Sequence, residues 1–141
     1  MLYDPIRKKR VAATPEERVR QKLIAQMIGA LQYPKGLLAV EKKLGACAQL
    51  LPDVDPHRRI DLLCFTPKKE GLIPLLLIEC KGEGGDSEDE AEKQLLGYNQ
   101  WISAPFLAIA RPNGIKMFWK EKEHVRSVLF LPSYPELVAS L

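Results

Sequence analysis

RIDLLCFTPKKEGLIPLLLIECK, residues 59–81, contains two apolar runs that have the composition of β-strands. The first run covers residues 59–65 and the second covers 73–81, and the polar segment TPKKEGL joins them. Two strand-like runs at this spacing predict a β-hairpin. If the loop is centred near Lys69 or Glu70, the numbers of paired residues add up to about 139 or 140.

This register brings charged side chains together at one end of the two strands. Asp61 falls opposite Ile78 or Glu79, with an error of a residue or two because bulges and loop asymmetry shift a register. Side chains alternate between the two faces of a strand, so Glu79 and Lys81 point to one side and Cys80 to the other. Two carboxylates and a lysine therefore gather at the rim of a predicted buried strand.

These three charged residues allow a catalytic and a structural interpretation. Carboxylate oxygens bind Mg²⁺. A bound metal lowers the pKa of its water and neutralises charge on a phosphodiester in the transition state. A lysine beside that water orients it and stabilises the developing charge. The structural alternative is an ion pair at a strand end, which contributes ~0–1 kcal/mol. The residues by themselves leave both interpretations open.

Length and composition predict one globular domain. The 141 residues are 46% hydrophobic and 28% charged, and we expect a basic arm at 1–13 followed by a single domain at 14–141. The longest apolar run, GLIPLLLI, is far shorter than the roughly 18 residues of a membrane helix. The charged N-terminus argues against a signal peptide. Three cysteines without CxxC spacing predict reduced thiols and a cytoplasmic protein: Cys47, Cys64 and Cys80.

Charge is unevenly distributed along the chain. Basic residues concentrate in the first part, whereas EGGDSEDEAE at 83–92 is an acidic block. A basic arm suits a polyanion such as nucleic acid, although a solvated tail has the same composition. The residues that we expect to contact nucleic acid are Lys8, Lys9, Arg10, Arg20, Arg58 and Arg59.

TPEERVRQKLIAQMIGALQ, residues 14–32, predicts the first helix. Thr14 is the expected N-cap, Pro15 occupies the first helical position, and Glu17 completes a capping box. The apolar residues recur at helical spacing and form one stripe: Val19, Leu23, Ile24, Met27, Ile28 and Leu31.

The remaining elements complete a mixed α/β order. A second capping box, Ser87 with Glu90, opens a helix over 87–102. This helix lies between strand 73–81 and strand 105–111, which predicts a βαβ unit with parallel strands. Further strands are expected at 37–44, 115–120 and 126–131, and a last helical turn or two at 134–141. We therefore predict one mixed sheet with helices packed on it.

Four motifs in this order resemble a known superfamily. They are TPEERVRQ on a helix, RRID, LLLIECK and QLLGYNQW, which together span about residues 14–111. This pattern resembles the PD-(D/E)xK nucleases, and more narrowly the N-terminal nuclease domain of type I restriction enzyme R subunits and its stand-alone relatives. The resemblance implies a restriction-endonuclease-like αβββαβ core. It also implies Mg²⁺-dependent hydrolysis of DNA by a metal-bound water, with Mn²⁺ as a substitute metal, and a homodimer or a larger restriction or repair complex.

The resemblance also assigns roles to individual residues. Asp61 would be the first metal ligand, Glu79 the second, and Lys81 the catalytic lysine. The Q-x-x-x-Y motif of the family would map onto Gln94 and Tyr98, which share one helical face at positions i and i+4. The alternative is an amphipathic helix in which the tyrosine packs and the glutamine is solvated.

The family also places a glutamate of the first helix near the metal. At about 100° per residue, Glu16 lies nearer the centre of the apolar stripe than Glu17, whose role the capping box already explains. We therefore expect Glu16 to be a direct or water-mediated ligand, with Glu17 as its rival. Favourable charge at a helix N-terminus is the plain alternative for both.

Some features depart from the family or leave the function open. RRID has Ile60 where the superfamily name has proline, and Arg59 shares the face of Asp61, so it contacts that carboxylate or a phosphate. No Walker A pattern occurs, which excludes a motor in this chain. The rival hypotheses are an inactive module that binds nucleic acid or a partner, and a purely structural role in which a sheet edge forms a dimer.

Overall fold

The computed structural model describes residues 1–43, 59–84 and 87–141. In chain order its elements are β1 Leu2–Asp4, β2 Lys9–Val11, α1 Pro15–Ile28, the 3-10 turn η1 Lys35–Leu37, β3 Leu38–Lys43, β4 Arg59–Lys68, β5 Gly71–Cys80, α3 Glu88–Ile102, β6 Phe106–Arg111, β7 Gly114–Glu121, β8 His124–Val128 and α4 Tyr134–Ala139.

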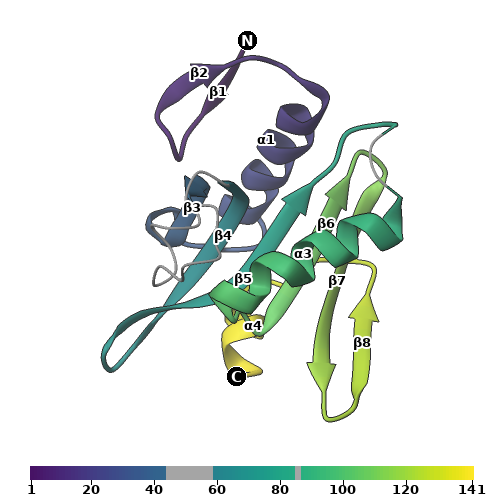
Figure 1. The fold of residues 1–141 in the computed structure, drawn as a ribbon. Helices are drawn as coiled ribbons and strands as arrows, with labels where there is room; N and C mark the ends of the chain where they lie inside the picture. Colours follow the sequence, from purple (N-terminus) through teal and green to yellow (C-terminus); the bar gives the residue numbers. More distant parts are fainter. Residues whose placement is uncertain (44–58, 85–86) are drawn as a thin grey trace.

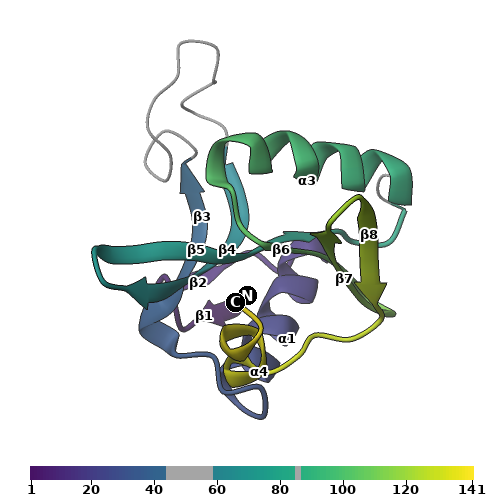
Figure 2. The ribbon, with the colours of Figure 1, turned by 90° about the horizontal axis from the view of Figure 1, so that it is seen from below.

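The centre of the fold is a six-stranded mixed sheet with the order β3-β4-β5-β6-β7-β8. Helix α3 covers one face, and α1 and α4 lie on the other (Figures 1 and 2). Strands β1 and β2 form a separate hairpin beside α1 (Figure 1). The order α1, β3, β4, β5, α3, β6 is the predicted αβββαβ core, and it is consistent with a restriction-endonuclease-like fold.

The predicted hairpin register is confirmed. β4 and β5 pair antiparallel, with Leu62 opposite Ile78. Lys68 pairs with Gly71 and closes a two-residue turn at Lys69–Glu70. Both strands extend further toward the turn than predicted, because the polar residues next to the turn also pair. β6 runs parallel to β5, as the βαβ pattern predicted.

β5 lies in the middle of the sheet and is buried on both faces. Residues 75–78 are fully buried. Leu76 and Ile78 belong to the core under α1, whereas Leu77 belongs to the core under α3. Each fully buried leucine or isoleucine stabilises the fold by ~1.5–3 kcal/mol relative to an exposed one. The charged residues that follow at the end of β5 are therefore attached to the most rigid part of the sheet.

The helix ends differ in detail from the predictions. Gly29 caps α1 with a non-helical ψ of −108°, so the helix ends at residue 28 rather than 32. Ser87 accepts the N–H of Glu90 at the start of α3, as predicted. β8 ends at residue 128, and the side chains of Leu129 and Phe130 are exposed. None of the described helices has the length and apolar character needed to cross a membrane.

Candidate active site

A line of polar contacts runs from the end of β5 to helix α3. The Nζ atom of Lys81 lies 3.4 Å from Oε1 of Glu79 and donates to Oε1 of Gln94 at 2.9 Å. Gln94 in turn donates to the hydroxyl of Tyr98 at 3.2 Å. The predicted i, i+4 pair on α3 therefore faces the end of β5, and its glutamine holds the lysine by a hydrogen bond.

Asp61 joins this group from β4. Its Oδ2 atom accepts the backbone N–H of Cys80 at 2.8 Å, which holds the carboxylate at the end of β5. Burial, and then the nearby charge of Asp61, raise the pKa of Glu79 above its ordinary value, while Lys81 partly offsets them. The structure thus brings together the two carboxylates and the lysine that the sequence singled out. Neighbouring Cys80 is a buried free thiol whose pKa is also raised by burial.

The sheet is irregular at Asp61. Ile60 packs in the core under α3 and Leu62 in the core under α1, although residues two apart normally share a face. On β3, Glu41 has a left-handed backbone with φ of 51°. The residues on either side of Glu41 and Asp61 pair across the strands, but these two do not. Such a break re-aims a side chain, and here it turns Asp61 toward α1.

Arg20 of α1 is the basic partner of this side of the site. It is 4% exposed, and its guanidinium lies 3.3 Å from Glu17, 3.2 Å from Glu41 and 3.8 Å from Asp61. Burial by itself lowers the pKa of Arg20, but the charges of Asp61 and Glu17 outweigh it and raise the pKa above its ordinary value. The expectation that Arg20 contacts nucleic acid is therefore corrected, because the side chain is enclosed by carboxylates.

The N-terminal hairpin supplies a second arginine. Asp4 is fully buried and accepts the N–H groups of Ile6 and Arg7, at 2.7 and 3.0 Å, and the Nε–H of Arg7 at 2.6 Å. This turn directs Arg7 toward α1 and β3, where it contacts Glu17 and lies 3.2 Å from Glu41. Residues 1–13, expected as an arm, thus contact the core through an ion pair.

The structure turns Glu17 of α1 toward the site, whereas Glu16 was expected there. Glu16 is exposed, whereas Glu17 is 5% exposed and faces the arginines. Thr14 accepts the N–H of Glu17, but the Glu17 carboxylate binds Arg7 and Arg20 instead of completing the capping box. The helical period did not predict which of the two glutamates is buried, because the N-terminal hairpin, not the sheet, covers the Glu17 side of the helix.

The other predicted contacts with nucleic acid lie at the surface. Lys8, Lys9 and Arg10 are exposed on the turn and second strand of the N-terminal hairpin. Arg59 is exposed and donates to the carbonyl of Glu41 at 3.3 Å. Arg58 lies outside the described residues. Their roles toward nucleic acid stay predictions.

The sequence analysis missed Arg7, and it treated Glu41 as an exposed strand charge in preference to a residue that reaches the site from the neighbouring strand. Arg7 was treated as one of several basic residues in an arm, although the preceding Asp4-Pro5 pair is a turn signal that indicates a hairpin. Glu41 is in an ordinary strand pattern, and no local signal marks its left-handed backbone. Within the described residues, no group of three or more His, Cys, Asp or Glu side chains is arranged to hold a metal ion.

Comparison with protein families shows which family the chain belongs to. The family described as type I restriction enzyme R protein N terminus matches residues 15–135, from the start of α1 into α4. No curated protein gives a significant match. The family match covers most of the chain and confirms the resemblance drawn from the sequence motifs. The chain belongs to the family of type I restriction enzyme R protein N termini.

Proposed function

We propose that this chain is a metal-dependent nuclease domain that hydrolyses phosphodiester bonds in DNA. One observation carries the proposal: Asp61 and Glu79 meet at the end of a buried strand, with Lys81 bound between Glu79 and Gln94. The family match and the restriction-endonuclease-like order of elements support it. An ion pair that served only stability would not need the glutamine and tyrosine of α3 aligned on the same lysine.

The donor set fits Mg²⁺, and Mn²⁺ as its substitute. Magnesium is bound in phosphoryl-transfer sites by one or two carboxylates, with waters and substrate phosphate in the other positions, so a pair of acids is sufficient. Asp61 and Glu79 would hold the ion, whose charge would oppose the burial and the repulsion by Asp61 that raise the pKa of Glu79. When bound, the metal would neutralise phosphate charge and make a coordinated water more acidic.

Side chains of this protein would orient the attacking water and stabilise the charge on the phosphate. The Lys81 side chain is only 12% exposed, so its ammonium is weakly solvated and acts strongly on a nearby anion. It would orient the attacking water and stabilise the charge that develops on the phosphate. Gln94 would hold Lys81 in place, and Tyr98 would hold Gln94.

One observation favours a second candidate, a module that binds nucleic acid or a partner without cutting. Both carboxylate oxygens of Asp61 already have partners: Oδ2 accepts the Cys80 N–H, and Oδ1 lies 3.8 Å from Arg20. A carboxylate that is satisfied in this way binds a metal less readily. The two candidates differ in whether Mn²⁺ binds and whether DNA is cut.

The test measures cleavage and metal binding separately. Cleavage of supercoiled plasmid and linear duplex is followed with Mg²⁺, Mn²⁺ or EDTA for the wild type, Lys81→Ala, Asp61→Asn and Lys69→Ala. Lys69→Ala is the matched control, because this lysine is exposed at the β4–β5 turn. We expect Lys81→Ala to lose about 10²-fold or more in rate, and the control to match the wild type.

Mn²⁺ binding by calorimetry supplies the readout that does not depend on activity. We expect binding to the wild type and to Lys81→Ala, and much weaker binding to Asp61→Asn. Unchanged cleavage in Lys81→Ala would sink the mechanism. DNA binding without metal binding or cleavage would establish the second candidate instead.

The family name also suggests partners. We propose that the chain acts on DNA in the cytoplasm, as a homodimer or within a larger restriction or repair complex. The buried free thiols of Cys64 and Cys80 support a reducing compartment.

A further inference from the structure

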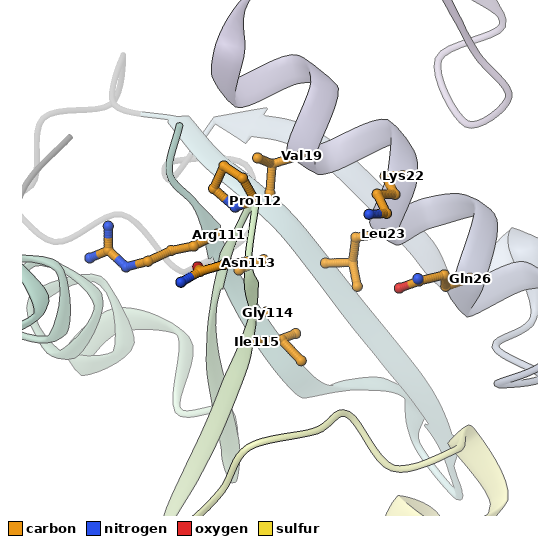
Figure 3. Close-up of a pocket in the computed structure, with 10 residues that line it drawn as sticks. Val19, Lys22, Leu23, Gln26, Arg111, Pro112, Asn113, Gly114 and Ile115 are labelled. Carbon is orange, nitrogen blue, oxygen red and sulfur yellow. The ribbon is translucent and has the colours of Figure 1, made fainter. Parts of the chain in front are cut away.

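A hollow of about 230 Å³ lies between α1 and the turn that joins β6 to β7 (Figure 3). Lys22 and Gln26 project from α1 toward this turn, and Asn113 lies on the turn itself (Figure 3). Apolar side chains, among them Leu23 and Ile115, line its floor. The hollow therefore combines a polar and basic rim with an apolar base.

This region is continuous with the end of the catalytic strand. The backbone N–H of Lys81 donates to the carbonyl of Ala110 at 2.8 Å, so the parallel register places Arg111 beside Lys81. Gly82 packs directly on the start of α1, since a Cβ on this glycine would lie 2.4 Å from the Cβ of Pro15. The start of α1, the β6–β7 turn and the catalytic lysine thus form one edge of the molecule.

Two basic side chains on the α1 side of this edge have no ion-pair partner in the part of the chain that the structure describes. Arg18 and Lys22 are exposed, and neither forms an ion pair with any described residue. They line an adjoining hollow of about 380 Å³ whose acidic residue is Glu83. On the α3 side, by contrast, Lys116 is paired with Glu92 at 2.9 Å and with Glu88 at 3.3 Å. An anion approaching this edge is therefore drawn to the α1 side.

We propose that this edge binds the DNA backbone next to the phosphate that is cut, through a turn surface made of Arg18, Lys22, Gln26 and Asn113. The proposal rests on the proposed function and names the binding surface of that site. Arg18 and Lys22 would contact phosphates, the two amides would donate hydrogen bonds, and the apolar floor would pack against deoxyribose.

The lining of the hollow also predicts how DNA is read. None of the described residues around it is aromatic, so it offers no ring on which a base could stack. Contacts to phosphate and sugar carry no sequence information directly. The turn surface is therefore expected to hold DNA of any sequence, and Arg18 and Lys22 take the role that the sequence had assigned to Arg20.

The test compares two variants that each lose two positive charges. Arg18→Ala/Lys22→Ala alters the turn surface, and Lys68→Ala/Lys69→Ala alters the exposed β4–β5 turn at the opposite end of the sheet (Figure 1). Binding of a fluorescein-labelled DNA duplex is measured by anisotropy in EDTA, over a series of salt concentrations. Each phosphate contact contributes a slope of about 0.9 in log K against log salt, so we expect the first variant to lose about 1.8 and the second none.

The outcomes are separable from those of the cleavage test. An unchanged slope in Arg18→Ala/Lys22→Ala, or an equal loss in Lys68→Ala/Lys69→Ala, overturns the proposal, as does a wild type that binds no DNA duplex or that prefers an RNA duplex. The expected slopes in a protein that does not cut DNA support the turn surface and refute the nuclease. Thermal melts of both variants confirm that these exposed substitutions leave the fold intact.

Discussion

Arg20→Ala should lower the free energy of unfolding by about 3 kcal/mol. The guanidinium is buried and lies 3.3 Å from Glu17, 3.2 Å from Glu41 and 3.8 Å from Asp61. Removing one partner of a buried ion pair costs ~3–5 kcal/mol, because the other charge stays buried without compensation. The lower end of this range applies, since Arg7 still contacts two of the three carboxylates.

Urea denaturation, followed by the fluorescence of Trp101 and Trp119, measures this loss. For a domain of this size, about 3 kcal/mol corresponds to a fall of roughly 10 °C in Tm. Arg18→Ala is the matched control, because it removes the same residue type from the exposed side of the same helix. We expect it to stay within about 0.5 kcal/mol of the wild type. Arg20→Lys should fall between the two, because an ammonium keeps the charge but lacks the fork that reaches several carboxylates.

The control decides how the result is interpreted. A loss of less than about 1 kcal/mol in Arg20→Ala would refute the reasoning, because the three carboxylates would then be compensated without this arginine. An equal loss in Arg18→Ala would refute it too, since the effect would then come from the helix and not from the buried network.

Three further substitutions probe the elements around the site, each by urea denaturation. For Asp4→Asn, burial favours a raised pKa of Asp4, but hydrogen bonds from Arg7 and the backbone hold the pKa below its ordinary value. The stability that Asp4 adds is therefore complete above the unfolded pKa of about 4 and is lost as pH falls through the folded pKa. The gap between the wild type and the variant should shrink in acid, and a constant gap contradicts this. Gly82→Ala should lower the free energy of unfolding by ~1–3 kcal/mol, because the new Cβ would lie 2.4 Å from the Cβ of Pro15. An unchanged free energy of unfolding would show that α1 shifts freely. Gly97→Ala should stabilise α3 by ~0.5–1 kcal/mol, because no atom lies within 4 Å of the added Cβ apart from the chain neighbours and the backbone of the helix itself. A loss of stability would contradict that packing.

The hairpin at the centre of the sheet was predictable because its information is local. Two apolar runs and a short polar loop determine the register, and the two-residue turn at Lys69–Glu70 leaves little freedom to shift it. That register was enough to place Asp61 at the height of Glu79. The helical spacing of Gln94 and Tyr98 gave their common face in the same way, and the structure directs that face at Lys81.

The position of the glutamates on α1 was not predictable from the helix alone. The helical period places Glu16 near the apolar stripe, but burial depends on what covers each side of the helix. Here a hairpin from residues 2–11 covers the side of Glu17, and its arginine contacts that carboxylate. A contact between a short N-terminal turn and a later helix leaves no periodic signal in the sequence.

The break in the sheet at Asp61 shows why a site of this kind resists sequence reasoning. Strand periodicity assumes that residues two apart share a face, and Ile60 and Leu62 break that rule where the chemistry is proposed. On the neighbouring strand, Glu41 has a left-handed backbone. A backbone strain of ~1–3 kcal/mol persists only where surrounding contacts determine it. The carboxylate of Glu41 contacts the half-buried Arg7 and the buried Arg20, which supplies such contacts. The N-terminal hairpin, α1 and β3 therefore act together to aim the aspartate, and Arg20, which was expected to bind DNA, lies among the carboxylates of this site instead.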